Sequence, residues 1–220
     1  MVSIIIPNYN KSKFIKETIL SVLNQTSNQW ECIIIDDNSN DNSLEIMDFL
    51  IAKNSKFSII KNSKCKGASF CRNLGASKAK GEYLIFLDAD DLIDEKCVEI
   101  RSKIMNSKRE LAFCVFKMGT FYNNIGDSSS IWDDFSGHHL NRFLSHDLPW
   151  AICSVIWRKN EFIRIGSFNT DFSRLQDVEL HTRALINKIS YKIVKDSKVD
   201  CYYRIDLDRI TETYFQLLNH

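Results

Sequence analysis

Apolar and polar positions follow one another in blocks along the first 90 residues, as in strands that alternate with helices. Short continuous apolar runs, typical of buried parallel strands, occupy residues 2–6, 32–35, 57–60 and 83–87. Helical spacing or a capping-box-like start predicts helices around residues 14–23, 42–51 and 68–77. This alternation predicts an α/β domain with an open, mostly parallel sheet and helices on both faces.

Beyond residue 110 the pattern is less regular. Apolar runs predict strands at residues 111–116, 151–157, 191–194 and 199–203, with a helix over residues 178–186 and a polar loop over residues 123–137. Residues 213–218 show half a helical pattern with nothing after it. We therefore expect the sequence to be truncated at its C-terminus.

Polar clusters follow three of the predicted strands, at the point where each strand ends. They are Pro7-Asn8-Tyr9-Asn10, Asp36-Asp37-Asn38 and Asp88-Ala89-Asp90-Asp91. In open parallel sheets, ligands bind beyond the carboxyl ends of the strands. We therefore expect the three clusters to meet at one edge of the sheet.

The third cluster places three carboxylates within four residues. Asp88, Asp90 and Asp91 repel one another unless a cation or water neutralises their charge. Such hard oxygen ligands suit Mg²⁺ or Mn²⁺, which keep open positions for substrate phosphates. A helix N-cap is the alternative, but it would use one aspartate only, so the cluster favours a metal site.

The other two clusters leave two interpretations open. The acidic pair Asp36-Asp37 either caps a helix or holds a turn, or one of its carboxylates accepts a hydrogen bond from a base or a ribose. Tyr9, just beyond Pro7, either packs within its loop or offers an aromatic platform for a base.

Composition fits one globular domain. The chain has 220 residues, 44% of them hydrophobic, and a net charge of +1. Acidic residues predominate in residues 31–50 and basic residues in residues 51–80, which indicates either solvated surfaces or a surface attracted to phosphates and anionic lipid heads. The seven cysteines are scattered and include no CxxC pair, so we expect free thiols in a reducing cytoplasm and no zinc knuckle.

The sequence lacks several targeting and nucleotide-binding signatures, which limits the classes of protein it can belong to. No signal peptide precedes residue 2, and no apolar run approaches the ~20 residues of a spanning helix, so we expect any membrane contact to be peripheral or to come from sequence beyond residue 220. No GxGxxG follows the first strand and no GxxxxGK[ST] occurs. A nucleotide diphosphate would then have to be held through a metal, in agreement with the aspartate cluster.

Four sequence blocks, in order, resemble family 2 glycosyltransferases of the GT-A fold over almost the whole chain. They are residues 2–10, residues 35–41, residues 67–75 leading to 81–91, and Gly166-Ser167-Phe168 followed by residues 175–180. The resemblance implies a Rossmann-like, mostly parallel sheet with a smaller acceptor-side subregion. It also implies a donor-binding half in residues 1–110 and, in residues 111–220, a half that binds the acceptor and carries the catalytic base.

The resemblance also implies roles for individual residues. Asp37 would hydrogen-bond a uracil-type base beside Tyr9 and Pro7. Arg72 would line the nucleotide pocket, and Asp88 would approach the ribose. Asp90 would ligate the metal, with Asp88 and Asp91 as further metal candidates. Asp177 would be the catalytic base, in a Gln176-Asp177 pair where the family often has Glu-Asp. From the residues alone, Asp177 at the start of an apolar-periodic helix is equally a helix cap, and the resemblance favours the base.

The implied activity is transfer of a sugar from a nucleotide-diphosphate donor, with UDP-sugar expected, to a hydroxyl acceptor with inversion. The implied cofactor is Mn²⁺ or Mg²⁺, and the implied product is a surface polysaccharide or a lipid-linked glycan. We expect a cytoplasmic location, with contact at the inner face of the membrane. We expect no nucleic-acid partner. One alternative is a module that binds nucleotide sugar and metal without catalysis. Another is a Mg²⁺-binding receiver-type signalling domain, which does not explain residues 140–200.

Several further residues are weaker candidates. Trp150 either stacks on an acceptor sugar or packs in the core, and His181 either supports the metal or acceptor or lies at the surface. Arg204 and Arg209 are candidates to reach the diphosphate. The neighbouring His138 and His139 either ligate a metal, or lie solvated or at a helix start.

Overall fold

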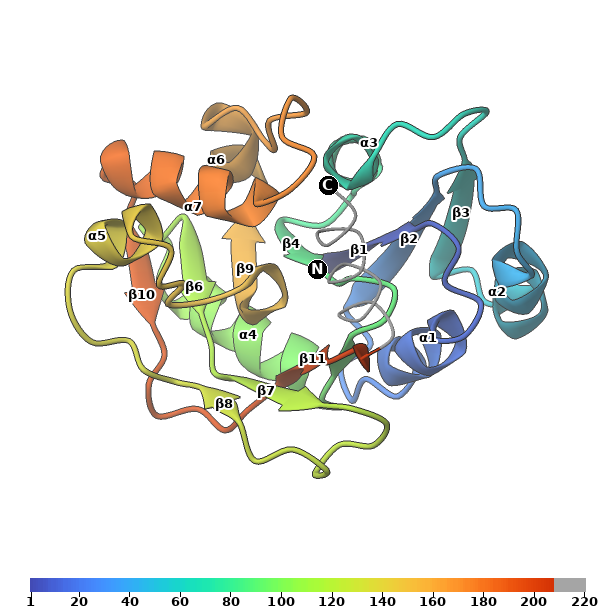
Figure 1. The fold of residues 1–220 in the computed structure, drawn as a ribbon, viewed down its shortest axis with the longest axis horizontal. Coiled ribbons are helices and arrows are strands. Elements are labelled where there is room, and N and C mark those ends of the chain that lie inside the picture. The colour runs from blue at the N-terminus through green and yellow to red at the C-terminus, as the bar shows by residue number, and fades with distance from the viewer. Residues whose placement is uncertain (208–220) are drawn as a thin grey trace, which may run out of the picture.

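The computed structural model describes residues 1–207, in which the predicted α/β architecture is confirmed (Figure 1). The main sheet has seven strands in the order β10-β6-β9-β4-β1-β2-β3. Their bounds are β1 Val2–Asn8, β2 Trp30–Asp36, β3 Phe57–Lys61, β4 Tyr83–Phe86, β6 Phe113–Val115, β9 Val155–Arg158 and β10 Tyr191–Ile193. All neighbours pair in parallel except β9, which runs antiparallel to both β4 and β6. The sheet is therefore mostly parallel and includes strands from both stretches of the sequence.

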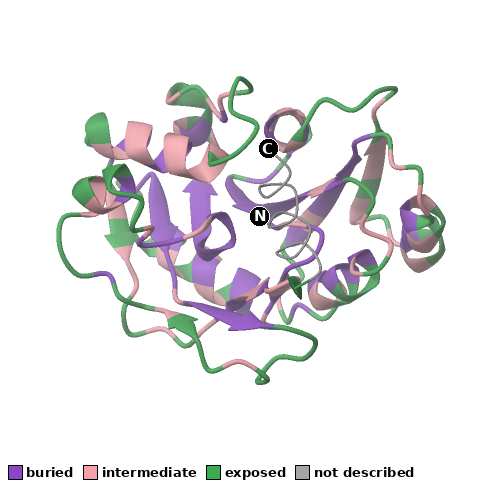
Figure 2. Ribbon diagram, viewed as in Figure 1, coloured by how far each residue is buried: buried purple, intermediate pink, exposed green. Residues whose placement is uncertain are grey.

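Helices cover both faces of this sheet because successive side chains of each strand point to opposite faces. The helices are α1 Ile15–Leu23, α2 Ser43–Ile51, α3 Ala68–Lys78, α4 Cys97–Ser107, α5 His139–Leu144, α6 Lys159–Arg164 and α7 Gln176–Ile186. One apolar core contains Ile4 and Ile6 of β1 with α1, α2 and α4 residues. A second core contains Ile5 with residues of α3, α6 and α7. The central strands are buried between these two layers, whereas the edge strands β3 and β10 are partly exposed, as the colouring in Figure 2 shows.

A smaller sheet of four strands lies beside the main one, along the lower edge of the view in Figure 1. Its order is β5-β11-β7-β8, with bounds β5 Leu92–Ile93, β11 Cys201–Arg204, β7 Met118–Phe121 and β8 Ile131–Trp132. Strand β11 pairs antiparallel with β5 and parallel with β7. This places the last described strand next to the chain that follows the aspartate cluster.

The structure differs from the sequence prediction mainly beyond residue 110. The expected polar loop at residues 123–137 includes β8, and the expected strand at residues 151–157 begins as the 3-10 helix η1 Ile152–Ser154 before β9. Strand β7 and the short helices α5 and α6 were not predicted. These elements have three to six residues apart from the two-residue β8, too few for a periodic pattern to emerge.

A buried ion pair joins α4 to the later part of the chain. Arg101 donates through Nε and Nη2 to both carboxylate oxygens of Asp200, at 2.8 and 2.6 Å, and through Nη1 to the Cys153 carbonyl at 2.8 Å. Both side chains are almost completely buried. An unpaired charge at this depth would be strongly unfavourable, so the pair fixes the segment before β11 against α4.

Two further findings concern the sequence expectations. In the described part of the chain, no helix is long and apolar enough to cross a membrane. Within residues 1–207 all seven cysteines are free, and only Cys65 is exposed.

Candidate active site

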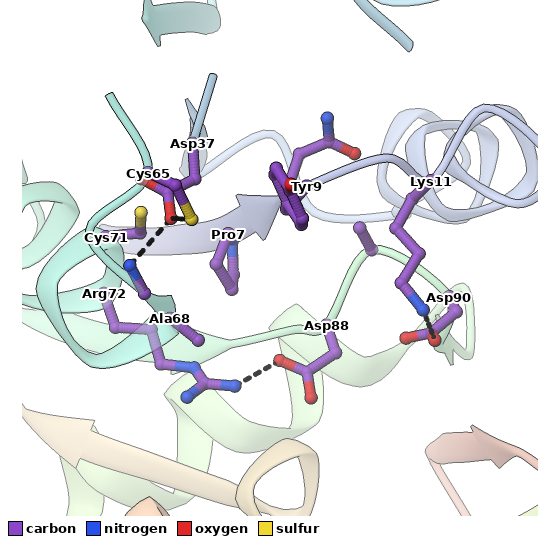
Figure 3. A pocket seen from close by; sticks show the side chains of 13 residues that line it. Pro7, Tyr9, Lys11, Asp37, Cys65, Ala68, Cys71, Arg72, Asp88 and Asp90 are labelled. Atoms are coloured by element: carbon purple, nitrogen blue, oxygen red, sulfur yellow. Dashed lines mark hydrogen bonds and ion pairs between the residues drawn. The ribbon is translucent and has the colours of Figure 1, made fainter. Parts of the chain in front are cut away.

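The polar clusters at the ends of β1, β2 and β4 meet in one cleft of about 300 Å³ (Figure 3). The residues lining it are Pro7, Asn8, Tyr9, Lys11, Asp37, Cys65, Gly67, Ala68, Cys71, Arg72, Asp88, Ala89 and Asp90. All the residues that the sequence analysis assigned to donor binding are among them. The parallel topology brings them together because successive strands end at the same sheet edge.

Asp37 lies at one end of this cleft and organises the chain that enters α3. Its carboxylate accepts hydrogen bonds from Asn62 Nδ2 at 2.7 Å, from Cys65 Sγ at 3.1 Å, and from the amides of Lys66 and Gly67 at 3.0 and 2.8 Å. Burial alone would raise the pKa of Asp37, but these hydrogen bonds outweigh it and lower the pKa. Asp37 is therefore held as a carboxylate at neutral pH.

Its neighbour Asp36 has a different role. Asp36 accepts from Asn8 Nδ2 at 2.8 Å and from the Ser39 hydroxyl at 2.6 Å. These bonds link the ends of β1 and β2 and hold the turn after β2. Of the two interpretations left open for the acidic pair, turn stabilisation applies to Asp36.

Arg72, from α3, links this cleft to helix α7. Its Nη2 lies 2.5 Å from Asp88 Oδ1, and its Nη1 donates to Gln176 Oε1 at 2.7 Å. The guanidinium is buried and also lies over the Phe168 ring, 5.3 Å from the centroid. One fixed side chain thus connects the end of β4 with the residue that precedes Asp177.

The carboxylates of Asp90 and Asp91 point in different directions. Asp90 lines the cleft and pairs with Lys11 Nζ at 2.5 Å. Asp91 is buried and accepts the backbone amide of Arg204 at 3.0 Å. Burial, together with the charges of Asp90 and Asp88, raises the pKa of Asp91 well above its ordinary value. Neither aspartate caps the following helix, for which Lys96 is the N-cap residue.

Arg204, a candidate for diphosphate contact, instead supports the aspartate turn from β11. Its Nε donates to the Asp90 carbonyl at 2.9 Å and its Nη2 pairs with Glu17. The guanidinium lies between the rings of Phe14 and Phe121, and the side chain is buried. Arg204 is therefore committed to the framework of the turn. Arg209 lies outside the described residues.

A second cavity, of about 480 Å³, adjoins the first and shares Arg72 and Asp88 with it. Its lining adds Asp91, Ala151, Ile152, Cys153, Ser173, Arg174, Leu175, Gln176, Asp177 and Tyr203. The shared Arg72–Asp88 pair separates the cleft where the strands end from the cavity that contains Asp177.

Asp177 lies in the first turn of α7 and does not cap the helix. The N-cap position is Leu175, which has a positive φ of 56°, and within the described residues no side chain caps this end. Asp177 Oδ1 accepts only its neighbouring amide, that of Val178, at 3.0 Å among the contacts described. Burial raises the pKa of Asp177, the positive charge of Arg72 lowers it, and the negative charge of Asp88 raises it, with a net upward shift. A carboxylate with a raised pKa in a cavity is suited to accept a proton.

Trp150 and His181 are core residues, which selects the core-packing interpretation of Trp150 and corrects the surface interpretation of His181. Trp150 is 1% exposed, so it packs in the core and does not face an acceptor sugar. His181 is fully buried on the inner side of α7, so it does not lie at the surface. Its ring lies 5.7 Å from that of Trp150 and 6.0 Å from that of Trp157, between centroids. An imidazole on the inner face of α7 completes an aromatic cluster.

The adjacent histidines also have structural partners. His138 is the N-cap residue of α5 and accepts the amide of Asn141. His139 Nδ1 lies 2.7 Å from the Tyr191 hydroxyl and its Nε2 lies 3.0 Å from the Phe135 carbonyl. Both therefore support the solvated or helix-start interpretation over metal ligation.

The metal candidates were tested against the donor set that the structure provides. Across residues 1–207, no group of three or more histidine, cysteine or acidic side chains gathers as a metal cage. Asp88 and Asp90 nevertheless line one cleft, each beside a cation, Arg72 and Lys11. Mg²⁺ in nucleotide sites commonly uses one or two carboxylates together with substrate phosphates, so these two residues fit such an ion. Asp91 lines the second cavity instead of the first and accepts the Arg204 amide, so it does not join these two residues as a ligand.

Sequence reasoning assigned no role to three residues of this region. Lys11 pairs with Asp90, Cys65 hydrogen-bonds Asp37, and Gln176 binds Arg72. The signal for Lys11 was its position directly after the Pro7-to-Asn10 cluster at the end of the first strand. Cys65 and Gln176 offered no comparable signal, because their partners are 28 and 104 residues away in sequence.

A family comparison decides the class to which this site belongs. The family model described as glycosyl transferase family 2 matches residues 3–168, which cover most of the chain. The chain belongs to glycosyl transferase family 2. The receiver-type signalling alternative is therefore wrong, and the resemblance inferred from the four sequence blocks is confirmed.

Named relatives support the same assignment of this family 2 chain. It is 45% identical over 218 residues to "UDP-Glc:alpha-D-GlcNAc-diphosphoundecaprenol beta-1,3-glucosyltransferase WfaP" of Escherichia coli, covering 99% of this chain and 82% of the relative. It is 35% identical over 192 residues to "Glycosyltransferase GlyG" of Streptococcus pneumoniae serotype 4, covering 87% of this chain and 60% of that relative. The chain thus spans less than two thirds of the length of some of its curated relatives.

Solved structures confirm the fold of this glycosyl transferase family 2 member. S. aureus TarS in complex with UDP-GlcNAc matches with a TM-score of 0.77 at 19% identity, over 93% of this chain and 58% of TarS. The mannosyltransferase PcManGT from Pyrobaculum calidifontis, in complex with GDP-Man and Mn²⁺, matches with a TM-score of 0.70 at 16% identity, over 94% of this chain and 57% of that one. The likeness establishes the GT-A-type fold.

Proposed function

We propose that this chain transfers a sugar from a UDP-sugar to a hydroxyl group of a lipid-linked glycan, with inversion at the anomeric carbon. The observation that carries the proposal is the pair of adjoining cavities that share the Arg72–Asp88 wall, with Asp177 in the second. A donor in the first cavity would present its sugar at this wall. An acceptor in the second would meet the sugar from the side of Asp177.

The donor cleft has the chemistry that a uridine diphosphate requires. The Asp37 carboxylate can accept from the imide N–H of uracil, and Tyr9, 49% exposed in the lining, offers a ring on which the base can stack. Asp88 would bind the ribose, while Lys11 and Arg72 supply positive charge for the diphosphate. The name of the E. coli relative gives UDP-Glc as its donor, which supports the same nucleotide here.

We assign metal binding to Asp90 and Asp88. A bound Mn²⁺ or Mg²⁺ would neutralise negative charge on the diphosphate leaving group. In this assignment the Asp91 side chain is not a ligand, because it accepts the Arg204 amide and thereby holds the turn. PcManGT, which shares the fold, forms a complex with GDP-Man and Mn²⁺ and is consistent with this assignment.

The reaction would be a single displacement. The acceptor oxygen forms a bond to the anomeric carbon while the bond from that carbon to the diphosphate oxygen breaks, and UDP leaves with the bonding electron pair. Asp177 takes the proton of the acceptor hydroxyl as this occurs. Its raised pKa makes it a better proton acceptor than an ordinary aspartate. Arg72, through Gln176, holds the start of α7 at the shared wall.

In this proposal, each half of the chain binds one of the two substrates. Residues 1–110 would bind the donor, and residues 111–220 would bind the acceptor and supply the base. The E. coli relative is named for a diphosphoundecaprenol-linked acceptor, which supports a lipid-linked acceptor of the same class. Since such an acceptor is held in a membrane, we place the enzyme in peripheral contact with the cytoplasmic membrane face.

Donor binding and product stereochemistry test this proposal. UDP-glucose with Mn²⁺ should raise the melting temperature, whereas ADP-glucose with Mn²⁺ should not, because tight binding to the folded state stabilises it by mass action. Incubation with UDP-glucose and a GlcNAc-diphosphate lipid should yield a β-linked product by NMR. Stabilisation by UDP-glucose without transfer to any hydroxyl acceptor would instead support the non-catalytic binding module. An α-linked product would contradict the inverting mechanism.

A further inference from the structure

Helix α7 carries an apolar groove on its outer face, away from the sheet. The apolar residues that line this groove of about 350 Å³ are Phe172, Leu175, Val178 and Ile186, and the exposed fractions of Phe172, Leu175 and Ile186 are 43%, 48% and 58%. Thr182, Asn187 and the paired Glu179 and Arg183 complete the lining. Positions 175, 178, 182 and 186 are three or four residues apart, so they fall on one face of the helix. The opposite face, with Leu180, His181 and Ala184, is buried in the core. Phe172, Leu175 and Ile186 are therefore exposed apolar residues outside the core, while Val178 also packs against it.

The groove is continuous with the cavity that contains Asp177. Leu175 lines both, and Asp177 lies two residues further along the same helix. Leu175 has a positive φ of 56°, a conformation that a bulky side chain rarely adopts. Such strain persists where the surrounding structure imposes it, often at functional sites. A molecule that reacts at Asp177 can thus extend over Leu175 into the groove.

An unpaired positive charge lies where the two meet. Arg174 lines the Asp177 cavity, is exposed, and has no ion pair or hydrogen bond with the part of the chain that the structure describes. The other arginines of this region are committed, Arg183 to Glu179 and Arg164 to Glu161. A free guanidinium binds phosphate oxygens strongly, and often through two hydrogen bonds.

We propose that this surface binds the lipid carrier of the acceptor, an inference that rests on the proposed function. Arg174 binds the phosphate that links the acceptor sugar to its hydrocarbon, and the groove formed by Phe172, Leu175, Val178 and Ile186 covers the first part of the hydrocarbon chain. The order of features, base then guanidinium then apolar groove, is the order of sugar, phosphate and hydrocarbon in such an acceptor.

The test uses three acceptors with the same terminal GlcNAc and measures KM and kcat for each. One has a diphosphate and a long polyprenyl chain, one a diphosphate with a methyl cap, and one a neutral octyl glycoside without phosphate. Variants Ile186→Ser and Arg174→Ala are compared with Phe49→Ser, which removes an exposed apolar side chain (85% exposed) from α2 in the donor half. Melting temperatures of all variants establish that they fold.

Ile186→Ser should raise KM for the polyprenyl acceptor about tenfold more than for the methyl-capped one. Arg174→Ala should raise KM for both diphosphate acceptors about tenfold more than for the octyl glycoside, since only the former carry the anion. Phe49→Ser should affect the three acceptors alike. The KM for UDP-glucose serves as the measure of donor binding throughout.

Three results would overturn the inference. In one, the rise in KM caused by Ile186→Ser depends on the acceptor's chain length no more than that caused by Phe49→Ser. The same holds if the rise in KM caused by Arg174→Ala is equal for acceptors with and without phosphate. In another, Ile186→Ser weakens binding to acceptor-free phosphatidylglycerol vesicles as much as it raises KM, which would assign the groove to the bilayer. In the third, wild type transfers to no acceptor at all, and then the proposed function fails with it. In the first two cases transfer by wild type leaves the proposed function intact.

Discussion

The two cavities differ in how their charged groups are held. In the donor cleft, Asp37, Asp88 and Asp90 each have a nearby donor or cation, supplied by the chain entering α3, Arg72 and Lys11 respectively. In the adjoining cavity, Asp177 accepts only the Val178 amide among its described contacts, and Arg174 has no described partner. The aspartates of the donor cleft are thus held by neighbouring donors or cations. In the adjoining cavity, Asp177 and Arg174 form no ion pair with the described residues.

Under the proposed function, this difference fits the needs of two different ligands. A diphosphate is always charged and the same for every donor of its class, so a fixed arrangement costs little reorganisation. A base must lose and regain affinity for a proton, and a tight ion pair would lower its pKa and weaken it as a proton acceptor. The aromatic cluster behind α7 provides rigidity without adding a charge near Asp177. The following predictions test this contrast, in order of decreasing effect.

Asp177→Asn should have the largest effect. The amide retains the shape but cannot accept the proton, so kcat should fall about a thousandfold, within the range for loss of a general base. Donor binding, measured by calorimetry with UDP and Mn²⁺, should stay close to wild type. The exposed Asp171, six residues earlier, supplies the control Asp171→Asn. Transfer at the wild-type rate by Asp177→Asn would remove this residue as the base.

Asp200→Ala should loosen the connection between α4 and the segment before β11. It leaves the Arg101 guanidinium buried without its partner, and the free energy of unfolding should fall by about 3 kcal/mol. Asp147→Ala breaks the exposed pair with Arg142 and should cost less than about 1 kcal/mol. Urea denaturation of both variants measures the difference. Equal losses would show that burial of the Arg101 pair contributes nothing special.

The buried imidazole behind α7 should make stability depend on pH. Burial lowers the pKa of His181 to about 3, from an ordinary value near 6.5. The unfolded chain therefore binds a proton at His181 below pH 6.5 while the folded chain does not, so stability decreases as pH falls through that window. Between pH 7 and 5 the His181 contribution should be about 2 kcal/mol.

His181→Leu removes this proton-linked term while keeping an apolar group in the cluster. The loss of unfolding free energy between pH 7 and 5 should therefore be smaller in the variant than in wild type. Urea titrations at both pH values measure it. If the two proteins lose stability in parallel, the imidazole is not held neutral as its burial requires.

Gln176→Glu should have the smallest effect. The new carboxylate would pair with Arg72 and stand beside Asp177, and both changes raise the pKa of Asp177. Since the base acts when deprotonated, the acidic limb of kcat/KM should move to higher pH by less than about one unit. Gln176→Ala removes the hydrogen bond without adding charge and serves as the comparison. A limb that moves to lower pH would contradict this account of the two sides.

The donor cleft was largely predictable, and the second cavity was not. Strand ends of a parallel sheet share one edge, so Pro7, Asp37 and Asp88 could be brought together from strand positions alone. The separate directions of Asp90 and Asp91 depend on a turn in which the Asp91 amide bonds the Asp88 carbonyl, which the run of aspartates does not reveal. The burial of His181 depends on rings from separate segments, including Phe143, Trp150 and Trp157, whose convergence no local pattern encodes.

The bonds of Arg204 join the aspartate turn to a strand that is synthesised much later. Its amide and its Nε hold Asp91 and Asp90, which precede it by 113 and 114 residues. A ribosome therefore finishes every residue that lines the first cleft, from Pro7 to Asp90, long before the residue that fixes the aspartate turn is made. We expect nascent chains stopped short of β11 to have little affinity for UDP with Mn²⁺, so that a growing chain does not sequester nucleotide before it can use it.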